Sequence, residues 1–349
     1  MGLGADVFLD PDDLDKSFAT GRNFATKLWN IGRFLLKNVG DESVRPFADV
    51  KVTELCRTDA WILERLDLAI RECDRAIGPV RPGAGVWAPD ELATGLRLNE
   101  LAETGRRFVW NELADWYLEA SKARLLTPGD DAEVARSVLV HVFDQALRLL
   151  HPIVPFVSEA LWQRLPGHVD GTFLATSSWP EARTTGLAPS RNGQEFELIK
   201  AIVEAMRRVR SEYAIPPGKA IDAFAVTTPP MRQMLGEELS LIARLARTHF
   251  TFVDQAPAGA AANVVLAGGT ELIVPLAGLI DVEKECARLN AELDALEKQL
   301  TALEARLANP GFVDRAPAHI VDAERAKREE WRTRAGLLRA RVEGLCGRS

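Results

Sequence analysis

The sequence has few of the residues that mark a metal site, a membrane segment or a secreted protein. It contains only four cysteines, Cys56, Cys73, Cys286 and Cys346, and these form no C-x-x-C pair. Their spacing excludes the common zinc-binding patterns and fits a reducing cytoplasm. No apolar run of about 18 residues occurs, and the residues after Met1 do not form a basic and then apolar signal. We therefore expect a cytoplasmic protein that is neither membrane-bound nor secreted.

Motifs of nucleotide and hydrolytic chemistry are also missing. The sequence contains no Gly-rich phosphate loop of either common kind, no H-E-x-x-H and no G-x-S-x-G. The five histidines are scattered, and His151 precedes a proline at an expected helix boundary, which favours a structural role. Paired carboxylates such as Asp130 and Asp131 lie at expected helix starts, where capping accounts for them. We therefore predict no catalytic residue and no metal site.

The sequence also has fewer basic than acidic residues. The net charge of −7 excludes a uniformly basic coat for nucleic acid, but it permits cations confined to one face. The length of 349 residues and the 47% hydrophobic content predict two or three domains with a substantial core.

The C-terminal segment, residues 281–349, predicts an antiparallel helical hairpin. Its first half has apolar residues that step alternately by four and three, the spacing of a coiled coil. They are Val282, Cys286, Leu289, Leu293, Leu296, Leu300, Leu303 and Leu307. The sequence Asn309-Pro310-Gly311 then breaks the helix. A second half repeats the spacing at Trp331, Ala335, Leu338, Val342 and Leu345. Each helix would be about 28 residues, or roughly 42 Å, long.

The second helix of this hairpin is rich in cations. Only Glu329 and Glu330 face them in the same stretch, which contains Arg325, Lys327, Arg328, Arg332, Arg334, Arg339 and Arg341. Nucleic-acid contact is one interpretation. A solvated helical face is another, and a structural coiled-coil dimer with no RNA role is a third.

Three regions follow from the pattern along the chain. Residues 1–185 read as a helical bundle, with amphipathic helices at 16–37, 55–77 and 89–122. Seven of the eight tryptophans precede residue 180, and we expect them in the core rather than stacked on bases. Residues 186–277 read as a small α/β module, with strands at 220–227, 248–253, 263–266 and 271–274 and helices at 194–213 and 231–245. Residues 278–349 form the coiled-coil arm.

Four segments resemble the anticodon-binding domain of the class I aminoacyl-tRNA synthetases for valine, isoleucine and leucine, in the order and approximate spacing of that family. They are GRNFATKLWN at 21–30, WNELADWYLE at 110–119, LHPIVPFVSEALW at 150–162 and Trp179-Pro180. Segments at 202–219, 278–281 and 309–317 resemble the valine branch in particular. The terminal coiled-coil arm also indicates the valine branch, and the missing cysteine zinc knuckle argues against the isoleucine branch.

The resemblance implies the tRNA-binding C-terminal part of a ligase that attaches valine to tRNA(Val) using ATP. The family's His-x-Gly-His and Lys-Met-Ser-Lys-Ser motifs and its inserted editing domain are not in this sequence. We therefore expect the chain alone to be inactive and to need no cofactor, because ATP and Mg belong to the catalytic half. We expect a monomer that works with tRNA(Val), and a separately encoded catalytic half is one possible partner. The alternative is a stand-alone RNA-binding accessory protein or an inactive synthetase paralogue.

The resemblance also suggests which residues contact RNA. An anticodon loop presents unstacked bases and phosphates, so its receptor needs cations, amides and an aromatic ring. On the first helix the candidates are Arg22, Lys27, Asn30 and Arg33, whose spacing prevents all of them from sharing one face with Asn23. The alternative for Asn23 and Asn30 is buried hydrogen bonding between helices. A second basic cluster, with an ordinary surface role as its alternative, comprises Arg207, Arg208, Arg210 and Lys219. In the arm the candidates, which would reach the outer corner of the tRNA, are Arg325, Arg328, Arg332 and Arg339.

Overall fold

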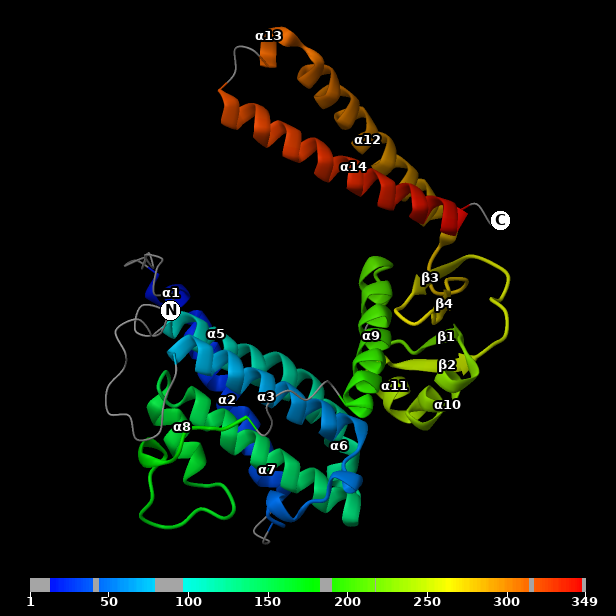
Figure 1. Ribbon diagram of the computed structural model, residues 1–349. Coiled ribbons are helices and arrows are strands. Elements are labelled where there is room, and N and C mark those ends of the chain that lie inside the picture. The colour runs from blue at the N-terminus through cyan, green and yellow to red at the C-terminus, as the bar shows by residue number, and fades with distance from the viewer. Residues whose placement is uncertain are drawn as a thin grey trace. The chain divides into compact units, whose positions relative to one another are not determined.

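The structure is a computed structural model that describes residues 13–39, 44–78, 97–182, 190–216, 218–313 and 317–346. The chain divides into two compact units, residues 1–197 and 198–349. The described residues are mainly helical with one small sheet (Figure 1), which confirms the predicted fold class. The boundary predicted between residues 185 and 186 lies outside the described residues, and the boundary after residue 277 stays a prediction.

The first unit is the predicted helical bundle. Its α-helices are α1 (Leu14–Ser17), α2 (Ala19–Val39), α3 (Arg57–Ile77), α5 (Leu98–Arg107), α6 (Glu119–Leu126), α7 (Asp130–Leu150) and α8 (Pro155–Trp162). Short 3₁₀ turns lie at η1 (Phe47–Asp49), η2 (Val52–Glu54) and η4 (Leu174–Thr176). Between α5 and α6 the chain stays helical through a π-helical segment, η3 (Phe108–Leu118). The long helix predicted at 89–122 is thus present from residue 98, and residues 89–96 lie outside the described ranges.

Apolar residues at helical spacing build the core of this bundle. On α2 the buried side chains include Phe24, Leu28, Ile31 and Leu35, which recur every three or four residues and so lie on one stripe. The prediction that the tryptophans lie in the core is confirmed in part, because Trp61, Trp116 and Trp162 are buried. Trp110 and Trp179 are half-buried, and 39% of Trp29 is exposed, on the side of α2 opposite to its buried stripe.

Helices α2 and α8 approach one another at Gly32. This glycine is buried, and a Cβ atom added there would lie 2.4 Å from Cδ2 of Leu161. Atoms at that separation clash, so an alanine here would force the buried Leu161 side chain or the helices themselves to shift.

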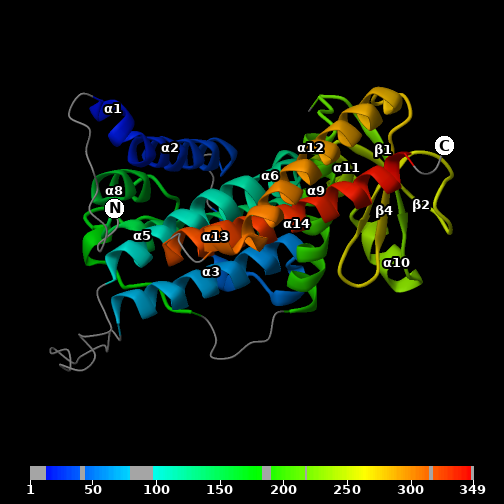
Figure 2. The same ribbon diagram turned by 90° about the horizontal axis from the view of Figure 1, so that it is seen from above.

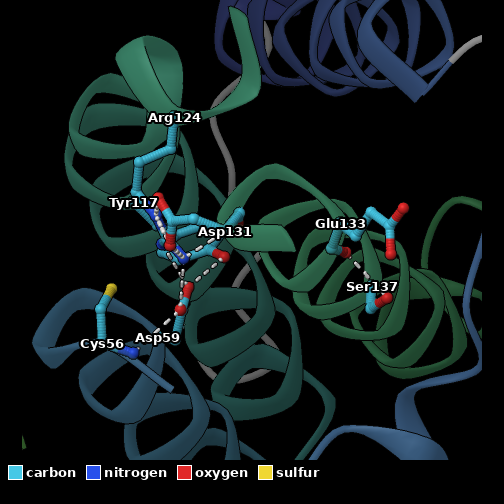
Figure 3. A network of polar contacts seen from close by, with 7 residues as sticks. All are labelled: Cys56, Asp59, Tyr117, Arg124, Asp131, Glu133 and Ser137. Atoms are coloured by element: carbon cyan, nitrogen blue, oxygen red, sulfur yellow. Dashed lines mark hydrogen bonds and ion pairs between the residues drawn. The ribbon is translucent and has the colours of Figure 1, made fainter. Parts of the chain in front are cut away.

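A buried polar network joins α3 to the helices that follow it (Figure 3). Asp59 is fully buried near the start of α3 and accepts hydrogen bonds from both terminal nitrogens of Arg124, each at 2.9 Å. It also accepts one from the Tyr117 hydroxyl at 2.8 Å and one from the backbone N–H of Cys56 at 3.2 Å. Arg124 pairs as well with the exposed Asp131 at 2.7 Å. Burial raises the pKa of Tyr117, which keeps the phenol protonated as a donor.

Helix α9 (Arg191–Glu212) spans the division between the units and leads into a four-stranded mixed sheet. The strands are β1 (Ile221–Val226), β2 (Thr248–Phe252), β3 (Ala261–Val265) and β4 (Glu271–Pro275). They lie in the order β2-β1-β4-β3, with β1 and β2 parallel and the other pairs antiparallel. The helix predicted at 231–245 is divided at Glu238 into α10 (Pro229–Glu237) and α11 (Leu239–Ala246), which connect β1 to β2.

The C-terminal arm, defined as residues 281–346, consists of α12 (Val282–Ala308), the short α13 (Pro310–Val313) and α14 (Ala318–Cys346). Helices α12 and α14 lie side by side in both views (Figures 1 and 2). On α12 the buried residues Leu289, Leu296 and Leu303 are seven residues apart, as the heptad pattern predicts. Facing them, α14 buries residues of the predicted set, including Leu338 and Leu345. One chain therefore supplies both helices of the hairpin.

A disulfide bond joins the two helices of the arm. Cys286 in the second turn of α12 is bonded to Cys346, the last residue of α14, with Cα atoms 6.0 Å apart. Nothing in the spacing of the cysteines indicated this bond, which a reducing cytoplasm does not favour. The partners are 60 positions apart, and only the antiparallel packing of the helices brings them together.

Candidate nucleic-acid interface

The solvent-facing side of α2 carries cations, an amide and an aromatic ring on one stripe. Arg22, Asn30 and Arg33 are all exposed. Trp29, Asn30 and Arg33 lie seven, eight and eleven positions after Arg22, so the four residues share one face of the helix. Asn23 is also exposed. The two asparagines therefore do not make the buried hydrogen bonds considered as an alternative. We call Arg22, Trp29, Asn30 and Arg33 the α2 stripe.

Lys27 does not belong to the α2 stripe. It points toward the bundle, where its ammonium nitrogen pairs with Asp115 at 3.0 Å and lies 5.3 Å from the ring centroid of Trp110. A cation held by a carboxylate and a ring face is partly satisfied inside the protein. Among the first-helix candidates, Lys27 is therefore the one committed to packing between α2 and the π-helical segment.

Trp29 is a candidate that the sequence reasoning missed, because tryptophan in a helical bundle is usually core. The guanidinium carbon of Arg164, just after α8, lies 6.0 Å from the ring centroid of Trp29. Aromatic rings with a nearby cation are the usual platforms for unstacked bases. The helical periodicity alone would have predicted its exposure, because position 29 falls opposite the buried positions 24, 28, 31 and 35.

The basic cluster predicted around residues 207–219 separates into two kinds of residue. Arg207 and Arg208 are exposed on α9, and Lys219 is exposed with its ammonium 3.2 Å from the carbonyl of Gly278. Arg210 differs, because only 8% of it is exposed and its guanidinium is used within the second unit.

Arg210 satisfies backbone carbonyls at the end of α11. Its Nη2 donates to the backbone carbonyls of Arg247 at 2.6 Å and Ala246 at 3.3 Å. Its Nη1 donates to the backbone carbonyl of Lys219 at 2.7 Å. The last carbonyls of a helix have no partner within the helix, so a buried arginine here supplies the missing donors. Burial lowers the pKa of Arg210. Its position accounts for the residue without any contact to RNA.

The arm arginines are exposed or half-buried, and they pair with acidic residues on the facing helix or on α14 itself. Arg332 lies 2.7 Å from Glu304 and Arg339 lies 2.7 Å from Glu297, both of which belong to α12. Arg325 pairs with Asp322 and Arg328 with Glu329 along α14 itself. Carboxylates of α12 thus neutralise much of the apparent excess of cations in α14. Exposed pairs of this kind contribute little to stability, about 0.2–1 kcal/mol each, so their arginines can exchange partners at small cost.

Arginines favour the ionised form of two carboxylates of α12, Glu285 and Glu292. The hydrogen bond from Arg334 lowers the pKa of Glu292, and the one from Arg288 lowers the pKa of Glu285. The arm therefore presents fixed charges of both signs at neutral pH.

Within the described ranges no group of three or more His, Cys, Asp or Glu side chains is placed to hold a metal ion. Among these same residues, no helix is both long and apolar enough to span a membrane.

Comparison with known proteins connects both units to tRNA ligases. Residues 90–225 match the family described as the anticodon-binding domain of tRNA ligase. Residues 281–346 match the family described as the valyl tRNA synthetase tRNA binding arm. The helical bundle and the arm thus place the chain among the tRNA-binding regions of aminoacyl-tRNA ligases.

Curated relatives define the branch of that class. A valine–tRNA ligase of Geobacillus kaustophilus is 34% identical over 93% of this chain, and one of Carboxydothermus hydrogenoformans is 37% identical over 92%. A third, from Parasynechococcus marenigrum, is 33% identical over 99%. The chain spans 35%, 34% and 38% of the lengths of these three relatives. It belongs to the valine–tRNA ligase family and is homologous to that ligase's C-terminal anticodon-binding and tRNA-binding region.

Proposed function

We propose that this chain positions tRNA(Val) for a valine–tRNA ligase, in which the α2 stripe contacts the anticodon region and the arm contacts the outer corner of the tRNA. The observation that carries the proposal is the α2 stripe, where Arg22 and Arg33 flank Trp29 and Asn30 on one exposed face. Cations suit phosphates, an amide suits a base edge and an indole suits a base face. The family matches support tRNA binding as such.

We further propose that the chemistry of valine attachment, with its ATP and Mg, belongs to ligase segments that this chain does not match. On this view the chain by itself forms no valyl-adenylate, acts as a monomer and works in the cytoplasm. A separately encoded catalytic half would then restore aminoacylation when it is added to this chain.

The test of the α2 stripe is binding of the full chain to tRNA(Val) and to a non-cognate tRNA across a salt series. We expect Arg33→Gln to weaken binding and to reduce the salt dependence by roughly one phosphate contact. Trp29→Ala should cost about 1–3 kcal/mol with little change in the salt dependence, because stacking releases no counterions. Lys51→Gln is the matched control, an exposed lysine outside α2. Equal effects of the two cation variants would contradict the assignment.

The arm allows a second test, because two of the candidate arginines, Arg332 and Arg339, have an acidic partner on the other helix. Arg339→Gln and Glu297→Gln both remove the same 2.7 Å pair, but only the first removes a cation that could meet phosphate. We expect Arg339→Gln to weaken tRNA binding and Glu297→Gln to leave it unchanged or strengthen it. If both variants weaken binding equally, these arginines serve the hairpin and not the RNA. Binding of both tRNAs with equal affinity would instead favour the RNA-binding accessory protein.

A further inference from the structure

The disulfide closes the arm at the end opposite its turn. Helix α12 passes through α13 into α14 at one end, and the Cys286–Cys346 bond joins the helices at the other. Figure 1 shows this second end at the base of the hairpin, where α12 begins and α14 finishes. The arm is therefore a closed loop of chain whose two helices are joined covalently at both ends.

Of the other two cysteines, Cys73 differs from this pair in accessibility, whereas Cys56 is half-buried as they are. Cys286 and Cys346 are both half-buried. Cys73 is fully buried, and burial raises the pKa of the Cys73 and Cys56 thiols to about 12, which leaves them as unreactive thiols at neutral pH. Cys286 and Cys346 are the two cysteines that the structure joins, and Cys56 and Cys73 stay free thiols.

The last turns of α14 carry the contact between the arm and the end of α9. The guanidinium of Arg341 lies 4.4 Å from the ring centroid of Tyr213 and donates to the carbonyl of Glu212 at 2.7 Å. It also lies 3.7 Å from Glu285 in the first turn of α12. Cys346 follows Arg341 by five residues, and the ends of helices fray unless something holds them. The disulfide is the covalent hold on this turn.

We propose that Cys286 and Cys346 form a redox-controlled clasp: the oxidised pair keeps the last turns of α14 ordered and the arm ready for RNA, and reduction loosens them. The RNA part of this inference rests on the function proposed above. A pre-organised arm binds more tightly than one that must be ordered on binding.

The reaction that sets the clasp is thiol–disulfide exchange with a small disulfide such as glutathione disulfide. The thiolate of one cysteine attacks glutathione disulfide, forming a mixed disulfide and releasing one glutathione thiolate. The second cysteine then attacks the mixed disulfide and releases another. Two protein thiols lose two electrons and two protons as the S–S bond forms, and one glutathione disulfide becomes two glutathione molecules.

The experiment equilibrates the full chain in glutathione buffers from fully reducing to fully oxidising and makes three measurements at each step. Thiols are counted under denaturing conditions, hydrogen exchange is measured over residues 338–346, and the affinity for tRNA(Val) is determined. We expect the thiol count to fall from four to two on oxidation. Exchange over 338–346 should slow, and the affinity should rise about tenfold, equivalent to about 1.4 kcal/mol.

Serine variants separate the clasp from other effects of the redox buffer. Cys286→Ser and Cys346→Ser should each abolish the redox response of exchange and of affinity, and both should behave like the reduced chain. Cys56→Ser is the matched control and should retain the full response, because Cys56 lies outside the arm in the first unit.

Each other outcome is decisive. A thiol count that stays at four, or exchange over 338–346 that is the same in both states, overturns the clasp. A redox-dependent exchange with unchanged tRNA affinity overturns its role in RNA binding and leaves the proposed function intact. Absence of tRNA binding in both states overturns the proposed function and the RNA part of this inference, while thiol count and exchange still decide the clasp itself.

Discussion

Replacing Asp59 by asparagine should destabilise the bundle far more than the same change at Asp131. Both carboxylates pair with Arg124, so the two variants make one chemical change on two sides of the same cation. They differ in environment: the Asp59 side chain is fully buried, whereas 63% of the Asp131 side chain is exposed. The comparison therefore isolates the effect of burial.

The magnitude follows from what remains after each change. In Asp59→Asn the guanidinium loses its buried counter-charge, and an amide cannot accept from two arginine nitrogens, Tyr117 and a backbone N–H together. Breaking a buried pair costs about 3–5 kcal/mol, and the remaining bond to Asp131 puts the value near the lower limit, about 3 kcal/mol. For a unit of this size that corresponds to a fall in melting temperature of roughly 6–12 °C. Asp131→Asn should cost about 0.5 kcal/mol.

The assay is urea unfolding followed by tryptophan fluorescence, which reports mainly on the first unit because seven of the eight tryptophans precede residue 180. Each variant is compared with the parent at pH 7, and hydrogen exchange over α3 checks that the loss is centred on the network. If Asp59→Asn loses no more stability than Asp131→Asn, the network is not what holds α3 to α6 and α7.

Three further predictions test other parts of the fold. Gly32→Ala should destabilise the first unit by about 1–3 kcal/mol in urea unfolding, because its Cβ would clash with α8. Gly21→Ala, in the same helix with open space around it, should stabilise it by about 0.5–1 kcal/mol. The hydrogen bond from Arg45 lowers the pKa of Glu54 from 4.5 to about 2, so its stabilisation is complete above pH 4.5 and is lost as the pH falls toward 2. Acid titration of Glu54→Gln should therefore show a smaller loss of stability in that window, and an unchanged curve would rule out the pair as its source. Arg210→Met should lower the melting temperature of the second unit without changing the salt dependence of tRNA binding; a changed salt dependence would instead give Arg210 an RNA contact.

Periodic features of this chain could be predicted from sequence because the position of each residue on its own helix decides its burial. The seven-residue recurrence of Leu289, Leu296 and Leu303 indicated the arm, and the spacing of the apolar residues in α2 indicated its buried face. The short runs of β-branched and apolar residues likewise indicated the strands of the small sheet.

Features that depend on pairing between distant segments could not be predicted in this way. The Cys286–Cys346 bond needs α12 and α14 to be antiparallel in one particular register, and the pairing of Arg339 with Glu297 needs the same register. Arg210 looked like a surface cation because its partners are carbonyls of a helix end more than 30 positions away. Trp29 was expected in the core because of its residue type, although its position on the helix already placed it opposite the buried residues of α2.

The pairing of α14 arginines with α12 glutamates also affects the rate at which the arm associates with RNA. A surface whose acids and arginines lie side by side projects almost no field beyond the Debye length of about 8 Å at physiological salt. Such an arm cannot draw a polyanion from afar, so its association should run at the unsteered rate of roughly 10⁵–10⁶ M⁻¹s⁻¹. Discrimination between RNA molecules would then reside in how long each complex survives, as the arginines pass from glutamate to phosphate and back.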